Sequence, residues 1–115
     1  MIAVIFEVEP AEGRGKDYFA RAADLRPLLE GMEGFISVER FRSLANDNRY
    51  LSLSFWRDEA SVAAWRQTEE HRLAQRDGRA GIFADYRLRI ASVMRDYGLR
   101  ARDEAPPDAR AYHGA

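Results

Sequence analysis

The chain offers few side chains that are able to exchange a proton near neutral pH. Its 115 residues include two histidines, His71 and His113, and no cysteine. Thiol catalysis, disulfides and cysteine-ligated metals are therefore excluded. An imidazole changes charge close to neutral pH, so His71 is the sharpest candidate for a general base. The competing interpretation is a solvent-facing histidine on a helix surface, between Glu70 and Arg72.

Three further side chains could share a site with His71. Gln75 follows His71 by four residues, so both lie on one face of a regular helix. Trp65 and Trp56 are candidate apolar walls of a substrate pocket. Core packing is the more common role of such tryptophans, and both interpretations stay open.

Glu39 is a fifth candidate, because it lies beside Arg40 in an otherwise apolar stretch. The two neighbours occupy opposite faces of a strand, so one of them is placed to point into a pocket. An ion pair at an interface is the more common role for such a charge. The sequence shows no phosphate-binding loop and no metal-ligand cluster, so no metal is expected.

The spacing of apolar residues predicts the elements that carry these candidates. In the first helix, the predicted core positions are Phe19, Ala22, Leu25, Leu29 and Met32. Strands are predicted over residues 2–9, 35–44, 49–57 and 86–97, and helices over 16–32 and from 58 to about 77.

The second helical stretch loses its apolar pattern at Thr68-Glu69-Glu70. On a continuous helix, the six residues from Trp65 to His71 would place the two side chains about 120° apart. If both line one cavity, the helix must break between them. We therefore expect an irregularity at this segment.

The order β-α-β-β-α-β predicts an α+β ferredoxin-like fold, with both helices on one face of an antiparallel sheet. Several strands carry apolar residues on both faces. Ile5 and Phe6 face opposite sides of one strand, and Phe55 and Trp56 face opposite sides of another. A sheet with one wet face alternates more cleanly than this. A second copy covering the free face would explain the pattern, so a homodimer is expected.

Charge and hydropathy limit the remaining partners and the location. The formal net charge is −1, which gives no basic excess for nucleic acid. No stretch approaches membrane-spanning length, and the first residues lack the basic region of a signal peptide, so a cytoplasmic location is expected. Residues 98–115 are expected to form a flexible extension, in which Pro106-Pro107 prevents any regular element.

Residues 1–97 resemble the antibiotic biosynthesis monooxygenase (ABM) domains of the dimeric α/β-barrel group. The resemblance rests on IAVIFEVEP at residues 2–10, GFISVERF at 34–41, LSLSFWRDEASVAAWR at 51–66, and His71 soon after. It implies a dimeric barrel of ferredoxin-like units. It also implies oxidation of a small aromatic, quinol- or phenol-like substrate with O2, without metal or organic cofactor. His71 would then be the catalytic base, and Gln75 a hydrogen-bonding neighbour of the substrate.

The resemblance leaves two alternatives open. The first is a non-catalytic module that holds a small apolar or aromatic ligand in the same pocket. The second is a haem-binding relative that uses a different ligand. Haem-degrading relatives carry an iron-ligating histidine ten residues after a tryptophan, and an asparagine in the first strand. Here Gln75 stands ten residues after Trp65, and Phe6 stands at the comparable strand position, so haem is disfavoured.

Overall fold

The computed structural model describes residues 1–113 and confirms the predicted order of elements. A short π-helical turn, Gly78–Ile82, leads into the last strand. The elements are β1 (Ile2–Pro10), α1 (Gly15–Glu30), β2 (Phe35–Arg42), β3 (Tyr50–Trp56), α2 (Glu59–Arg66), α3 (Glu69–Asp77), β4 (Phe83–Ser92) and α4 (Pro107–His113).

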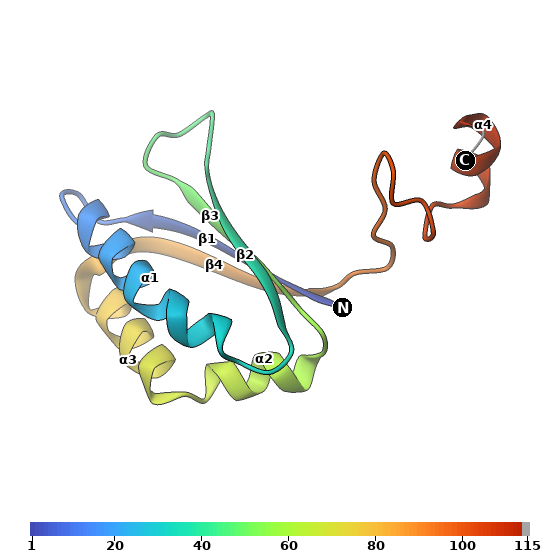
Figure 1. Cartoon of the computed structure of the whole chain (residues 1–115). Helices are drawn as coiled ribbons and strands as arrows, with labels where there is room; N and C mark the ends of the chain where they lie inside the picture. The colour runs from blue at the N-terminus through green and yellow to red at the C-terminus, as the bar shows by residue number, and fades with distance from the viewer. Residues whose placement is uncertain (114–115) are drawn as a thin grey trace.

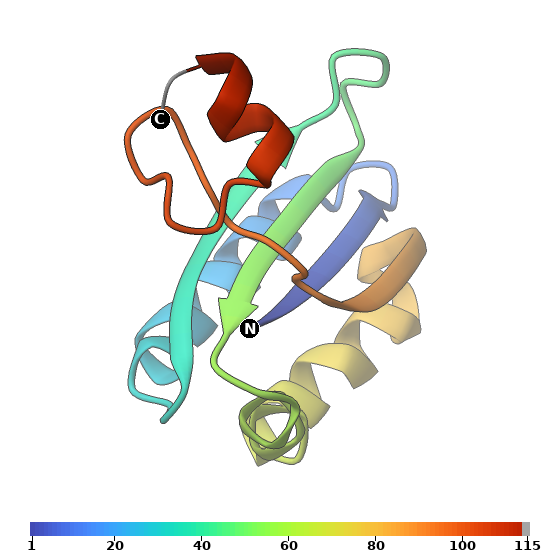
Figure 2. The ribbon, with the colours of Figure 1, turned by 90° about the vertical axis from the view of Figure 1, so that its right-hand side faces the viewer.

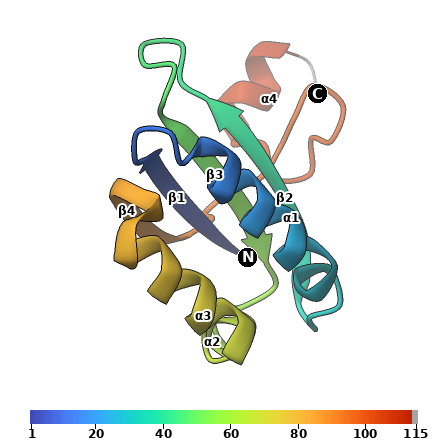
Figure 3. The ribbon, with the colours of Figure 1, turned by 90° about the vertical axis from the view of Figure 1, so that its left-hand side faces the viewer.

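The four strands form one antiparallel sheet in the order β2-β3-β1-β4. Helices α1, α2 and α3 lie on one face of this sheet, nearest the viewer in Figure 3, and Figure 2 gives the view from the opposite side. This arrangement is the α+β ferredoxin-like fold expected from the sequence. Among the described residues, no helix is both long enough and apolar enough to cross a lipid bilayer.

Strand β2 changes its register near its start. The pairing with β3 shifts between Phe35 and Ser37, so the strand holds one extra residue there. This irregularity places Phe35 against the core, in edge contact with Trp56 at a centroid distance of 5.3 Å. Simple alternation along the strand would turn Phe35 to the side of Glu39, but the bulge reverses the facing of the residue before it.

The core face of α1 also differs by one position from the prediction. Tyr18 is 5% exposed, whereas Phe19 is 42% exposed. Both residues stand one helical turn before Ala22, so spacing alone does not separate them. The structure turns Tyr18 inward, where it packs with Val8 and Ile82.

The predicted helix break is confirmed between α2 and α3. Helix α2 begins after Asp58, whose side chain accepts a hydrogen bond from the Ser61 amide at 2.8 Å, and ends at Arg66. Helix α3 begins at Glu69. Gln67 and Thr68 therefore separate the two helices, at the point where the apolar pattern weakens.

The last strand begins and ends earlier than predicted. Strand β4 pairs only with β1, and the register matches Ser92 with Ile2 at the start of β1. Beyond Ser92 the Val93 amide still donates to the Met1 carbonyl at 3.0 Å, but the alternating residues that follow, up to Tyr97, do not extend the strand.

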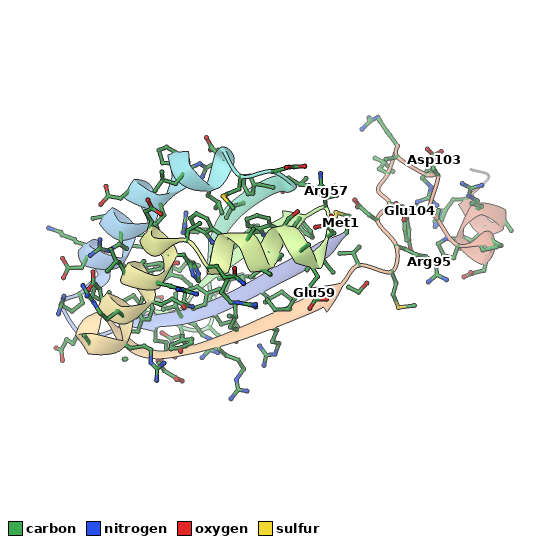
Figure 4. The ribbon with its side chains drawn as sticks, turned by 90° about the horizontal axis from the view of Figure 1, so that it is seen from below. Met1, Arg57, Glu59, Arg95, Asp103 and Glu104 are labelled. Carbon is green, nitrogen blue, oxygen red and sulfur yellow. The ribbon has the colours of Figure 1, made fainter. Side chains whose placement is uncertain are left out.

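The segment after β4 leaves the sheet and projects beyond its end (Figure 1). Figure 4 shows Arg95, Asp103 and Glu104 on this extension, apart from Met1, Arg57 and Glu59 of the domain. Contrary to expectation, the extension contains a regular element, because α4 begins at Pro107. Proline is well suited to a first helical position, where its missing amide proton has no partner to lose. The flexibility of the segment stays a prediction.

Candidate functional site

A cavity of about 220 Å³ lies between the helices and the sheet. Its walls are mostly apolar. They come from all three covering helices and from every strand of the sheet. The aliphatic and aromatic lining residues are Val4, Phe6, Tyr18, Ala22, Leu25, Leu29, Val38, Trp56, Val62, Trp65, Ala74, Ile82, Phe83, Leu88 and Ile90. Such a concave apolar chamber with few polar groups is typical of a small-molecule site.

The helix break brings His71 into this cavity. The Thr68 hydroxyl donates to the carbonyl of Trp65 at 2.8 Å and accepts the backbone amide of His71 at 3.2 Å. One side chain thus closes α2 and caps the start of α3. The resulting turn sets the imidazole beside the Trp65 indole, with ring centroids 5.4 Å apart.

The environment of His71 favours a neutral, proton-accepting ring. The side chain is half-buried, and its Nδ1 is enclosed without a hydrogen-bond partner in the described part of the chain. Burial lowers the pKa of the imidazole. A hydrogen bond with the Arg66 backbone raises the pKa, and the positive charge of Arg66 lowers it further. A neutral histidine is the form that accepts a proton from a substrate.

Three of the remaining predicted site residues line the same cavity. Gln75 follows His71 by one helical turn, and Trp65 and Trp56 form apolar walls. Trp56 is only 1% exposed, and its Nε1 donates to Ser54 Oγ at 2.9 Å. Trp56 is therefore a core residue and at the same time part of the cavity wall.

Glu39 does not line the cavity, which corrects its assignment as a substrate-binding residue. It is exposed on the opposite face of β2, where it pairs with Leu53 of β3. Successive strand residues face opposite sides, so its neighbour Arg40 occupies the cavity wall instead.

Two further polar residues line the cavity: Tyr18, which its spacing did not indicate, and Arg40, the neighbour that was weighed beside Glu39. The Tyr18 hydroxyl and Arg40 Nε are both buried, and neither has an acceptor for its own proton in the described residues. Burial raises the pKa of Tyr18, while a hydrogen bond from the nearby Arg40 guanidinium and the charge of that group act in the opposite direction. Buried polar atoms are rarely left unpaired, so these two mark a place where a ligand atom is expected.

The charges around the cavity have one sign. Its lining includes the guanidinium-bearing side chains of Arg21, Arg26, Arg40 and Arg66. Arg21 forms an ion pair with Asp77, and Arg26 forms one with Glu30 at 2.8 Å. Among the side chains that the structure describes, no aspartate or glutamate lines the cavity. In that same part of the chain, no three His, Asp or Glu side chains gather to hold a metal ion.

The sequence matches a family of known proteins. The family model described as "Antibiotic biosynthesis monooxygenase" matches residues 1–77. A "Jasmonate monooxygenase ABM" from Pyricularia oryzae is 46% identical over 93 residues, which cover 81% of this chain and 43% of that protein. The chain therefore spans less than half the length of this relative. The protein YqjZ of Bacillus subtilis, of uncharacterised function, is 31% identical over 81% of this chain and 79% of its own length.

Solved structures share the fold at low sequence identity. One from Deinococcus radiodurans, described among the antibiotic biosynthesis monooxygenases, superposes with a TM-score of 0.77 at 7% identity, covering 86% of this chain and 98% of that one. Rv0793 from Mycobacterium tuberculosis gives a TM-score of 0.76 at 10% identity, covering 84% of this chain and 98% of its own. These similarities support the fold of the domain that encloses the cavity.

Proposed function

Because the chain belongs to the antibiotic biosynthesis monooxygenase family, we propose that it oxidises a small phenol- or quinol-like substrate with O2 in this cavity. The chemistry would need no metal or organic cofactor, since the substrate itself would supply the electrons. The observation that carries the proposal is His71, whose unpartnered Nδ1 is buried in the wall of an apolar cavity.

The proposed reaction begins with proton transfer from the substrate to His71. A phenol loses its hydroxyl proton, and the resulting phenolate is electron-rich enough to reduce O2 and bind it at a ring carbon. Breaking the O–O bond and losing the proton of that carbon leaves a carbonyl group. One oxygen atom stays in the quinone, the other leaves as water, and His71 returns its proton to that departing oxygen. Phenol plus O2 thus gives quinone plus water, with atoms and electrons balanced.

The lining of the cavity favours His71 over other bases. A carboxylate base would need a pKa raised by burial, but no described carboxylate lines the cavity. Tyr18 is buried with a raised pKa and so keeps its proton near neutral pH. Trp65 and Trp56 would enclose the substrate, and Gln75 would hydrogen-bond to it. Exclusion of water then protects the reactive anion.

Two non-oxygenase functions are the alternatives. A non-catalytic module would hold the same ligand in the same cavity and consume no O2. A haem-binding protein would need an iron ligand other than Gln75, which takes the place of the histidine in haem-degrading relatives. The relative from P. oryzae favours oxygenation, because its name specifies a monooxygenase of a small molecule, jasmonate.

We also propose that the protein acts as a cytoplasmic homodimer. The sheet face opposite the helices carries Ile5, Leu53 and Phe41, which alternate with cavity-facing neighbours. Phe41 is 43% exposed in the single chain. Packing two such faces together would bury these residues in the barrel typical of the family.

Oxygen consumption with a panel of substituted quinols and phenols tests the proposed activity. An oxygenase should consume one O2 for each quinone formed, and added catalase should return no oxygen, since the second oxygen atom leaves as water. Binding of the panel without oxygen uptake would favour the non-catalytic module instead.

A further inference from the structure

The cavity has a second polar end that the proposed proton transfer does not use. Trp65, which His71 contacts, packs against the core cluster that contains Val38 and Trp56. Tyr18 belongs to a different cluster, built around Val8 and Ile82. His71 and Tyr18 therefore lie against separate parts of the core.

Arg40 lies at the Tyr18 end. On the sheet it pairs with Ser52, which in turn pairs with Phe6 of β1. Phe6 packs against the cluster that contains Tyr18. The influence of the Arg40 guanidinium on the Tyr18 pKa agrees with this placement.

Both groups at this end are hydrogen-bond donors, and the Arg40 guanidinium lies within hydrogen-bonding reach of the Tyr18 oxygen. The Tyr18 hydroxyl and Arg40 Nε are buried, and neither has an acceptor for its own proton within residues 1–113. Arginine stays protonated at all physiological pH values. The other cavity arginines that have carboxylate partners, Arg21 and Arg26, pair outside the apolar lining with Asp77 and Glu30. Arg40 is half-buried with its Nε enclosed, and such a charge without a counter-charge is costly unless a ligand supplies one.

We propose that Tyr18 and Arg40 bind a carboxylate of the substrate, which is therefore a small amphipathic acid. This inference rests on the proposed function and narrows its substrate class. The phenolic oxygen has to approach His71 to lose its proton, so the oxygen group held by Arg40 is a different one. The apolar body then spans the cavity between the two ends.

The test compares a matched pair of probes that differ in charge alone. The probes are 3-(4-hydroxyphenyl)propanoate and its primary amide, titrated into the full chain by calorimetry near neutral pH and without oxygen. The wild-type protein should bind the acid about tenfold or more tightly than the amide, the ratio expected of a charge-assisted hydrogen bond in a buried site. Arg40→Met should abolish this preference, and Tyr18→Phe should reduce it.

Arg26→Met is the matched control. Arg26 also lines the cavity, but it has its own partner in Glu30, so the preference for the acid should persist. If Arg40→Met does not fold, Arg40→Gln replaces it, since it keeps a polar stem and loses the charge. A third probe, 4-ethylphenol, identifies which oxygen Arg40 holds. If Arg40→Met weakens the binding of this neutral phenol as much as the binding of the acid, Arg40 binds the phenolic oxygen and the proposal is wrong.

The outcomes separate this proposal from the proposed function. Equal affinity for acid and amide in the wild-type protein, or binding of neither probe, would overturn the carboxylate site even if oxygen uptake is found with neutral quinols. Selective binding of the acid without oxygen uptake by any substrate would overturn the oxygenase and leave the carboxylate site standing. His71→Ala should retain the acid preference, because the imidazole lies at the other end.

Discussion

The imidazole of His71 lies 5.4 Å from the indole of Trp65, with the two rings inclined by 59°. Six residues separate them in the sequence, a spacing that would turn them about 120° apart on one continuous helix. They meet because the chain leaves α2 after Arg66 and starts α3 at Glu69. The interruption between two short helices thus creates the cavity end at which proton transfer is proposed.

Thr68 should control this geometry, because its hydroxyl bonds both the Trp65 carbonyl and the His71 amide. Thr68→Val keeps the shape of the side chain and removes these hydrogen bonds. Loss of a helix cap of this kind costs about 1 kcal/mol, so the melting temperature should fall by several degrees. Oxygen uptake should fall as well, since the imidazole is no longer held. Thr68→Ser is the control and should retain the melting temperature and the oxygen uptake of the wild-type protein. Unchanged values in Thr68→Val would show that the cap does not position His71.

The pH dependence of turnover should follow the pKa of His71. Burial lowers this pKa below the ordinary value of 6.5, so the ring is neutral at pH 7. Activity should therefore be full above the lowered pKa and should decline as the pH falls through it, because a protonated ring accepts no proton. The same shift makes the folded state less stable in acid, since the unfolded chain binds the proton more readily. A rate–pH profile whose acidic limb lies above 6.5 would contradict this assignment.

The sequence predicted the elements well because their signals are local. Alternation in β1 and β3 and the weakened pattern before His71 were sufficient to place the strands and the helix break. Features set by tertiary contacts were missed. Tyr18 and Phe19 have equivalent spacings from Ala22, and only packing against Val8 selects Tyr18.

Glu39 was assigned to the site rather than Arg40 because strand periodicity shows that two neighbours face opposite ways, but not which of them faces the helices. The end of β4 was likewise not visible in the alternation, which continues to Tyr97, whereas the strand ends at Ser92.

Haem should not be degraded by this protein. Gln75 and Phe6 both line the cavity at the positions where haem-degrading relatives carry a histidine and an asparagine. Titration with haem, followed by a reductant in air, should leave the iron in the porphyrin, as measured with an iron(II) chelator. Release of iron at a rate above that of free haem would refute this prediction.

Dimerisation should depend on the sheet face opposite the helices. Sedimentation of the wild-type protein at micromolar concentration should give about twice the mass of one chain. Phe41→Glu places a charge on the proposed interface and should shift the protein towards monomer. Leu44→Glu is the control, because Leu44 is fully exposed in the turn between β2 and β3 and lies outside the sheet. A wild-type protein that sediments as a monomer would remove the basis for the barrel.

The central claim is that His71 takes the proton that starts the reaction with O2. Oxygen uptake by His71→Ala, measured with and without added imidazole, tests it most directly. The substitution should lower turnover by roughly 10²–10⁴-fold, the usual contribution of a general base. Free imidazole should restore part of the rate by entering the vacated space beside Trp65, with a pH dependence that follows its own pKa. Turnover that is unchanged in His71→Ala, or a lost rate that imidazole does not restore while substrate binding remains intact, would contradict the role of His71 as the base.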